Sequence, residues 1–281
     1  MLGAIIGNML LAIFMHKIGW RQSYAWAALF ALFLAILAWI CIRDYPDHYQ
    51  IKAKSKLTLH KVIANVKLLS REPQIWLQSM YIALMYETIT VFCGLWANPF
   101  LRRAFDLNLE QATMSCSLVL VGIGIGSPIS GILCDTDHKK AKCIKVCAVA
   151  MFVLMCAILY IPILPIWLIN ILMFTLGVSG SSLILCFAIV SDIAPEGAKS
   201  TSVGLTNTLS LSSAVILQPI IGWILNMLSH KATTEGLELY SANNFRIALS
   251  ILPVMIFLAF IVAIYIDREF KKAVKKRAMS K

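Results

Sequence analysis

Charged residues are scarce in this 281-residue sequence, and acidic residues are scarcer than basic ones. Charged residues make up 14% of the chain, with 14 Asp and Glu against 25 Lys and Arg. Hydrophobic residues make up 59%, whereas soluble domains carry roughly 45–50% apolar residues. Because the surplus lies in repeated long apolar runs, the composition excludes an ordinary soluble protein and indicates an integral membrane protein.

Several patterns that indicate other protein classes are missing. The sequence shows no series of alternating strands of about ten residues, as an outer-membrane barrel requires. Its eight cysteines are scattered and suggest no disulfide framework. No basic segment with a small-residue cleavage site precedes the first apolar run, so we expect no signal peptide. The net charge of +11 lies in loops and the tail, which favours membrane topology over nucleic-acid binding.

Signatures of catalysis, metal binding and nucleotide binding are also missing. The apolar runs hold no paired acids, no His and no HExxH helix. Cys134, His138, Cys143 and Cys147 lie near one loop, but their spacing matches no common zinc pattern. The glycine-rich run 122–126 lacks the last glycine of a nucleotide-binding loop and follows no strand. We therefore expect no enzyme activity, no catalytic residue, no metal and no cofactor.

Eight runs are candidates for membrane-crossing helices, since lipid-facing segments must satisfy their own backbone hydrogen bonds. They are residues 1–15, 23–42, 74–98, 111–134, 143–161, 164–190, 200–228 and 245–266. The first run begins directly at Met1 and is shorter than the about 20 residues that a span needs. We expect the chain to begin inside a transmembrane helix, with a short interfacial helix as the alternative.

The positions of the basic residues predict the orientation of the chain. Most of the 25 Lys and Arg residues fall in the connector 43–72, around residues 139–145 and in the tail 268–281. Cytoplasmic loops carry an excess of Lys and Arg, so these segments and the C-terminus are predicted to be cytoplasmic.

The second half of the 43–72 connector has an apolar face. Leu59, Val62, Ile63, Val66 and Leu69 fall on one side of a helix, and lysines lie elsewhere. This pattern predicts an amphipathic helix on an anionic membrane surface. An ordinary solvated linker helix is the alternative.

A stripe of small residues marks the run 111–134. Gly122, Gly126 and Ser130 recur every four residues, and Gly131 follows. Such a stripe leaves one helix face without bulk, so a neighbouring helix is expected to approach closely there.

The end of the same run carries a more specific pattern. Gly131-x-Leu133-x-Asp135, followed by Lys139-Lys140, resembles the GxLxDxxGRK loop of the major facilitator superfamily. It departs from that pattern at Thr136, where a base is usual, and at His138, where glycine is usual. The resemblance implies a conformational-switch loop. Physically, Asp135 could bind the N-terminal amides of the helix starting near Ser200, or simply cap a helix.

Three further segments resemble the same family in the same order. Gly19-Trp20-Arg21 resembles the loop between its fifth and sixth helices, and the connector 43–72 resembles its central cytoplasmic loop. Ser191-Asp192-Ile193-Ala194-Pro195, Gly204-Leu205-Thr206-Asn207 and Gln218-Pro219-x-x-Gly222 resemble its tenth-to-eleventh helix region. The resemblance implies an all-α polytopic bundle in which this chain holds helices five to twelve of twelve. The implied parts are a remnant of the N-terminal half (1–42), a linker (43–72), the C-terminal six-helix half (73–267) and a basic tail (268–281).

Polar residues inside three runs are the candidate site. Glu87 is the only acid inside any run; it shares a helical face with Thr90, and Tyr86 lies beside it. Polar faces also contain Asn170 in one run, and Asn207 and Gln218 in another. The family resemblance places all three helices beside the central cavity, which makes these six residues candidates for the substrate or proton site. The alternative for the amides is hydrogen bonding between helices.

An acid near the middle of a span costs a few kcal/mol, so a functional role is expected for Glu87. It could carry a proton or pair with a cationic part of the substrate. With the resemblance, this predicts a proton-coupled symporter of a small polar metabolite that works by alternating access in a bacterial inner membrane. The implied partners are substrate, coupling ion and bilayer, without nucleic acid. Multidrug-type efflux, or a non-transporting remnant or scaffold because four family helices are missing, are the alternatives. Substrate and oligomeric state stay open.

Overall fold

The computed structural model describes residues 17–42, 59–195, 197–228 and 240–279, together with Gly3, Gly7 and Phe14. For Asp137 and residues 270–279 it describes the backbone alone. The regular elements in these ranges are all helical, and no strand occurs among the described residues. The predicted first run, 1–15, lies almost entirely outside the described residues, as does the first part of the 43–72 connector.

The helices follow one another with short connections. They are α2 (Trp20–Cys41), α3 (Leu59–Leu69), α4 (Pro73–Glu87), the π-helix η1 (Thr88–Trp96), α5 (Ala97–Phe105), α6 (Leu109–Leu133), α7 (Asp137–Tyr160), α8 (Ile166–Gly180), α9 (Ser182–Ile193), α10 (Lys199–Leu228), α11 (Ala242–Leu249) and α12 (Ile251–Met279). Within the described residues, seven continuous helical stretches are long and apolar enough to cross a bilayer. They coincide with the last seven predicted runs, so the predicted all-α transmembrane bundle is confirmed.

The chain divides into two compact units, Met1–Leu59 and His60–Lys281, and the boundary falls inside the predicted 43–72 linker. In the smaller unit, α2 is an apolar helix, and the Ser23 hydroxyl donates to the carbonyl of Gly19 at 2.8 Å. The larger unit contains the remaining helices and the site.

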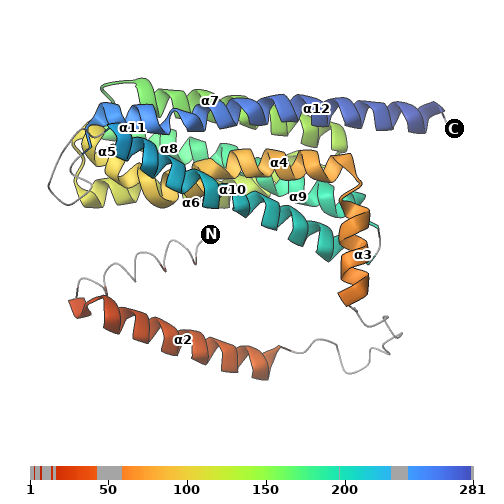
Figure 1. Ribbon diagram of the computed structural model, residues 1–281, viewed down its shortest axis with the longest axis horizontal. Helices are drawn as coiled ribbons and strands as arrows, with labels where there is room; N and C mark the ends of the chain where they lie inside the picture. The colour runs from red at the N-terminus through yellow and green to blue at the C-terminus, as the bar shows by residue number, and fades with distance from the viewer. Residues whose placement is uncertain are drawn as a thin grey trace. The chain divides into compact units, whose positions relative to one another are not determined.

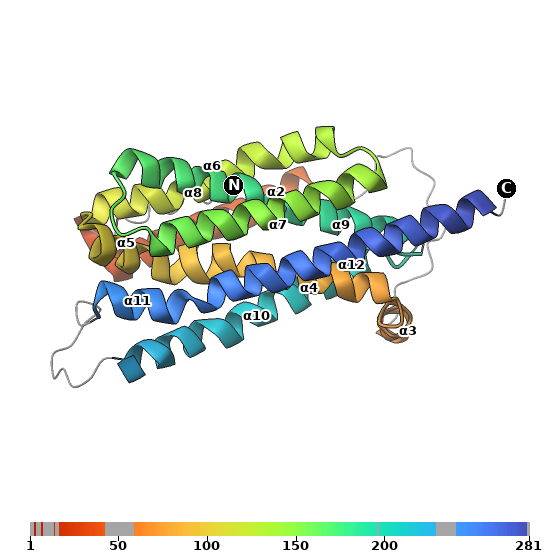
Figure 2. The same ribbon diagram turned by 90° about the horizontal axis from the view of Figure 1, so that it is seen from above.

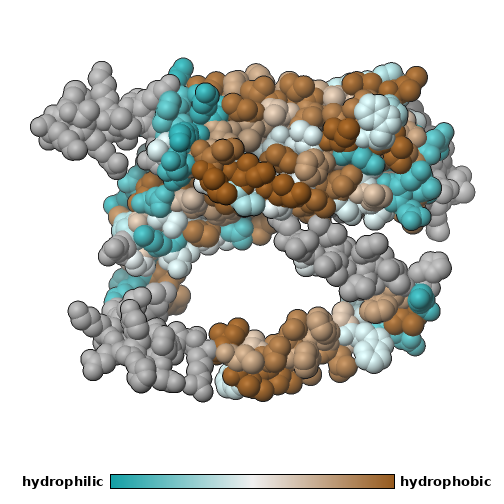
Figure 3. Space-filling view, turned by 180° about the vertical axis from the view of Figure 1, so that it is seen from behind, coloured by the Kyte–Doolittle hydropathy of each residue, from teal (hydrophilic) through white to brown (hydrophobic). Residues whose placement is uncertain are grey.

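In the larger unit the long helices run side by side, and α3 lies across the end from which α12 extends (Figure 1, Figure 2). Apolar residues form a belt across the middle of the visible face, and hydrophilic residues gather toward both ends (Figure 3). Leu69 of α3 is buried against Ile75 and Ala194, and the Asn65 amide donates to the carbonyl of Gly197 at 3.3 Å. The last turns of α3 therefore dock on the α9–α10 connection.

The closest helix contact joins α6 to α8 through glycine. A Cβ atom added to Gly122 would overlap the carbonyl oxygen of Phe174, and one added to Gly177 would overlap that of Val119. About two turns after Gly122, the Ser130 hydroxyl lies 2.7 Å from that of Ser181. The prediction that the small-residue stripe admits a close neighbour is confirmed, and the neighbour is the α8–α9 stretch.

Polar contacts join α7 to α11 at one end and to α12 toward the other end. Arg246 of α11 donates to the carbonyl of Leu159 at 3.0 Å, in the last turn of α7 where helix carbonyls lack intrahelical partners. Toward the other end, Lys145 Nζ lies 2.7 Å from the carboxylate of Asp267, whose side chain is buried. These contacts hold α12 beside α7, and α12 in turn packs along α4.

Candidate functional site

Glu87 ends α4, directly before the π-helix η1. Its side chain is 1% exposed, and neither carboxylate oxygen has a hydrogen-bond partner among the described residues. π-helices are rare and appear mostly as single-turn bulges at functional sites, whereas η1 runs from Thr88 to Trp96. The acid therefore lies where the regular helix gives way to a wider one.

The neighbouring helix α10 presents polar groups to this junction. The Ser213 hydroxyl donates to the carbonyl of Ser210 at 2.6 Å, lies 3.4 Å from the carbonyl of Ala83, and also faces Glu87. One and a half turns on, the Gln218 side-chain amide donates to the carbonyl of Thr90 at 3.2 Å. Gln218 thus supplies a donor to the π-helix backbone, and Ser213 brings a hydroxyl to the acid.

Four of the six candidates come together at this place. Thr90 donates to the carbonyl of Tyr86 at 3.0 Å, so Tyr86, Glu87 and Thr90 form one turn, and Gln218 reaches it from α10. Asn170 lies elsewhere, and its carbonyl oxygen accepts a 2.6 Å hydrogen bond from Ser115 between α6 and α8. That contact corresponds to hydrogen bonding between helices, the alternative raised for Asn170.

The structure also places Asn207 apart from Glu87. Asn207 is exposed on α10, eleven residues before Gln218, which corresponds to about 16 Å along a helix. The polar face predicted for the run 200–228 is therefore divided, with only its second half at the acid.

Sequence reasoning missed a second set of buried polar groups, which lie on α4 and η1. Gln78 is fully buried with neither side-chain atom hydrogen-bonded, and Thr88 Oγ1 and Trp96 Nε1 also lack partners among the described residues. By contrast, Ser79 bonds Thr206 of α10 at 3.1 Å. The signal for Gln78 was visible, because a glutamine stands inside an apolar run, but it lies on the opposite helical face from Glu87.

The predicted switch loop forms two ion pairs. Asp135 Oδ1 lies 2.7 Å from Lys139 Nζ, and this interaction lowers the pKa of the exposed Asp135 carboxyl. Lys140 Nζ lies 3.2 Å from Asp192 Oδ2 near the end of α9, and Gly131 is exposed with open space around it. Asp135 therefore pairs with the start of α7, whereas the amides considered for it begin α10.

The comparisons with known proteins agree with this architecture. The family model described as Major Facilitator Superfamily matches residues 1–219. The chain belongs to the major facilitator superfamily.

A solved structure supports the superfamily fold. The crystal structure of a bacterial homologue of the human lysosomal transporter Spinster, in an inward-facing and unoccupied conformation, is similar with a TM-score of 0.55 and 16% identity. The match covers 97% of this chain and 66% of that chain, so this chain spans just under two thirds of that structure's length. A search of curated proteins gave no match. Membership of this superfamily makes the chain a multi-pass membrane protein of a transporter family.

The described residues around the cysteines form no metal centre. Within the described ranges, no group of three or more His, Cys, Asp or Glu side chains could hold a metal ion. Cys143 and Cys147 lie 3.9 Å apart between their sulfur atoms, one helical turn apart on α7.

Proposed function

We propose that the protein is a secondary transporter that couples the movement of a small polar solute to protons, with Glu87 as the proton-carrying group. One observation supports this most directly: the carboxylate is buried without a hydrogen-bond partner among the described residues. A charge in such a position is unfavourable, so the group is stable when it holds a proton or neighbours a cation.

The surroundings of Glu87 support a group that changes state. Ser213 uses its hydroxyl on backbone carbonyls, so a modest rotation could redirect that donor to an ionised carboxylate. In the adjacent π-helix, the Thr90 carbonyl accepts a hydrogen bond from the Gln218 side chain. Under alternating access, the two halves of the superfamily fold rock about a midplane site, and a proton on Glu87 would bias the equilibrium between the two conformations.

The experiment compares the 281-residue chain with Glu87→Gln, which keeps the shape and removes the ionisable group. Both are reconstituted in proteoliposomes with a trapped pH dye and challenged with sugars, amino acids and small carboxylates. We expect a solute-dependent proton flux that Glu87→Gln abolishes. Glu110→Gln is the matched control, because Glu110 is an exposed acid at the start of α6.

Infrared difference spectroscopy tests the titration of Glu87 without a known substrate. A protonated-carboxyl band that disappears in Glu87→Gln and persists in Glu110→Gln is expected. Solute-dependent proton flux of equal size in the wild type and Glu87→Gln would refute the proposed role. Apolar-cation export, or no transport with an intact Glu87 titration, would instead point to the efflux or scaffold alternatives.

A further inference from the structure

Helix α3 (Leu59–Leu69) lies across one end of the larger unit, whereas the candidate spans run along it (Figure 1, Figure 2). The first of these spans begins at Pro73, four residues after α3 ends. A candidate span is long enough to cross the hydrocarbon core, so its first residues stand where the bilayer meets water. Helix α3 therefore lies at the level of the lipid headgroups, in the orientation of an interfacial helix.

One face of α3 docks on the protein, and a neighbouring face is left open. Leu69 is fully buried, and the Asn65 amide donates to the carbonyl of Gly197 at 3.3 Å. Ile63 and Val66, which belong to the apolar face predicted from the sequence, are 58% and 37% exposed. At about 100° per residue they share one side of the helix, and the docked side adjoins it. The protein therefore covers only part of the apolar face.

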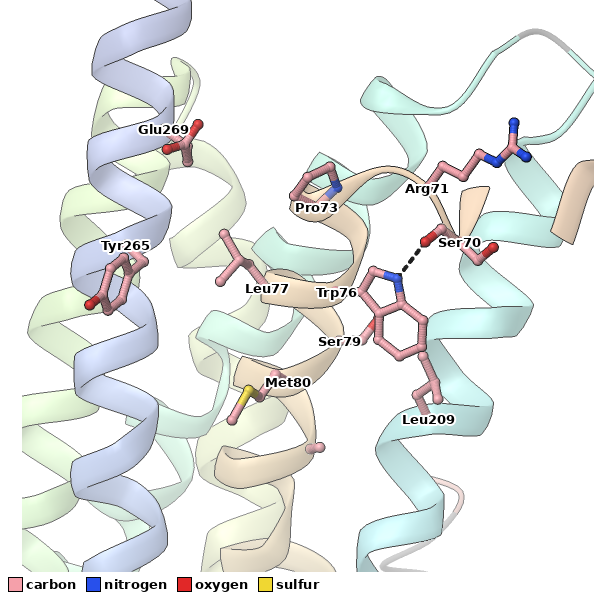
Figure 4. Close-up of a pocket in the computed structure, with 11 residues that line it drawn as sticks. Ser70, Arg71, Pro73, Trp76, Leu77, Ser79, Met80, Leu209, Tyr265 and Glu269 are labelled. Carbon is pink, nitrogen blue, oxygen red and sulfur yellow. Dashed lines mark hydrogen bonds between the residues drawn. The ribbon is translucent and has the colours of Figure 1, made fainter. Parts of the chain in front are cut away.

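The open apolar face continues onto the first span. Ser70 follows Val66 by one turn, and its backbone N–H donates to the Val66 carbonyl at 2.8 Å. The Ser70 carbonyl in turn accepts a 2.8 Å hydrogen bond from the indole of Trp76, which stands in the first turn of α4 and is 48% exposed (Figure 4). Because Trp is enriched where membrane and water meet, this indole marks the depth of α3 in the bilayer.

Two basic residues border the open face. Lys67 lies one turn after Ile63, and Arg71 lies one turn after Lys67, and both basic side chains are exposed. Neither forms an ion pair among the described residues. Arg71 extends away from α12 (Figure 4). Within residues 59–72, Glu72 is the one acid against three basic residues, so this segment carries a net positive charge.

We propose that α3 is a lipid-binding helix that selects phospholipids with anionic headgroups. Ile63 and Val66 enter the boundary of the acyl chains, and Lys67 and Arg71 bind the negatively charged headgroups beside them. Basic side chains suit this position because their aliphatic stems lie along apolar surface while the charge stays in water. An anionic leaflet strengthens binding by about fivefold for each Lys or Arg near its surface. A zwitterionic leaflet offers the same acyl chains without net charge, so lipid charge decides how firmly α3 is held.

The test is hydrogen–deuterium exchange of the intact 281-residue chain in nanodiscs of phosphatidylglycerol or phosphatidylcholine with identical acyl chains. We expect the α3 amides to exchange more slowly in phosphatidylglycerol, by roughly 25-fold when both basic residues contribute. Lys67→Gln or Arg71→Gln is expected to reduce this ratio by about fivefold, and the double variant to remove most of it. High salt should do the same, since the Debye length falls to about 3 Å at 1 M. The matched control combines Arg102→Gln with Arg103→Gln, which changes two exposed charges in α5 at the other end of the bundle (Figure 1).

A second pair of variants tests the open face. Ile63→Ser is expected to speed the exchange of α3 in both kinds of nanodisc. Leu68→Ser is expected to change it less, because Leu68 is 50% exposed on the opposite side of the helix. The α6 amides report whether each variant keeps its fold.

Equal exchange of α3 in the two lipids, which an ordinary solvated linker helix would show, overturns the proposal. So do equal effects of Ile63→Ser and Leu68→Ser. A ratio that the α5 double variant lowers as much as the α3 double variant does so too, because it assigns the lipid effect to the overall charge of the chain.

Discussion

Two helix contacts in the same bundle differ in whether their buried polar side chains are hydrogen-bonded. Between α6 and the α8–α9 stretch, glycines let the backbones touch, and the polar side chains there bond one another, as Ser115 does with Asn170. Between α4–η1 and α10, the buried Glu87 carboxylate has no hydrogen-bond partner among the described residues, and neither has the side-chain amide of Gln78 on the other face of α4.

The difference lies in how fully the polar groups are paired. Helices in a bilayer associate through close packing and hydrogen bonds, and the α6–α8 contact uses both. The α4–η1–α10 contact also contains hydrogen bonds, from Ser79 to Thr206 and from Gln218 to Thr90, but it leaves the Glu87 carboxylate unsatisfied among the described residues. An unsatisfied buried group lowers stability and is retained where a group must bind or release something. We infer that α6–α8 holds the bundle and that α4–α10 carries the chemistry.

The largest expected effect comes from adding bulk to the glycine contact. Gly122→Leu would force α6 away from the backbone of Phe174, and overpacking costs roughly 1–3 kcal/mol and sometimes more. We expect a large fall in the melting temperature of the detergent-purified protein. Gly204→Ala is the control, because nothing lies within 4 Å of its added Cβ and alanine favours helix by up to about 1 kcal/mol. Equal melting temperatures for the two variants would contradict the close-packed scaffold.

Replacing a buried polar residue by leucine is expected to change stability in opposite directions in the two regions. Glu87→Leu removes a buried carboxylate that has no hydrogen-bond partner among the described residues, and is expected to raise stability by about 1–3 kcal/mol while proton coupling is lost. Asn170→Leu breaks the bond to Ser115 and is expected to lower stability by about 0.6 kcal/mol, with proton coupling retained. Thermal unfolding and the proteoliposome flux assay measure both. A destabilised Glu87→Leu would show that the acid is a structural partner after all.

The scaffold was more predictable from the sequence than the site. Apolar runs reveal spans because a helix in lipid must be long and apolar, and the Gly122, Gly126 and Ser130 stripe reveals a close contact because small side chains recur on one face. Both features are periodic and local. The identity of the partner, Gly177, required the fold.

The site depended on features that have no local signature. Glu87 was noticeable as an acid in an apolar run, yet nothing in the sequence of Thr88–Trp96 predicts the π-helix that the structure shows there. Helical spacing put Asn207 and Gln218 on one polar face, but only Gln218 reaches η1. Spacing identifies a face and does not say how much of it one neighbour covers.

A smaller effect is expected at the π-helix itself. Gln218→Leu removes the donor to the Thr90 carbonyl and is expected to cost about 0.5–1.5 kcal/mol. Hydrogen–deuterium exchange should then rise across Thr88–Trp96 and stay unchanged in α6. If exchange rises equally in both, Gln218 supports the whole bundle, and the two regions are less independent than their contacts indicate.

The smallest effect is expected in the loop that joins α6 to α7. Lys139 lowers the pKa of Asp135 below its ordinary value of 3.8, so any stabilisation by this pair is present above 3.8 and is lost as the pH falls through the lowered pKa. Because both side chains are exposed, Asp135→Asn should barely change the melting temperature at neutral pH, and its small difference from the wild type should vanish in acid. A fall at neutral pH as large as that of Asn170→Leu would mean that Asp135 has a stronger partner, as the amides at the start of α10 would be. The α6–α7 loop would then be grouped with the α4–η1–α10 region and not with the α6–α8 contact.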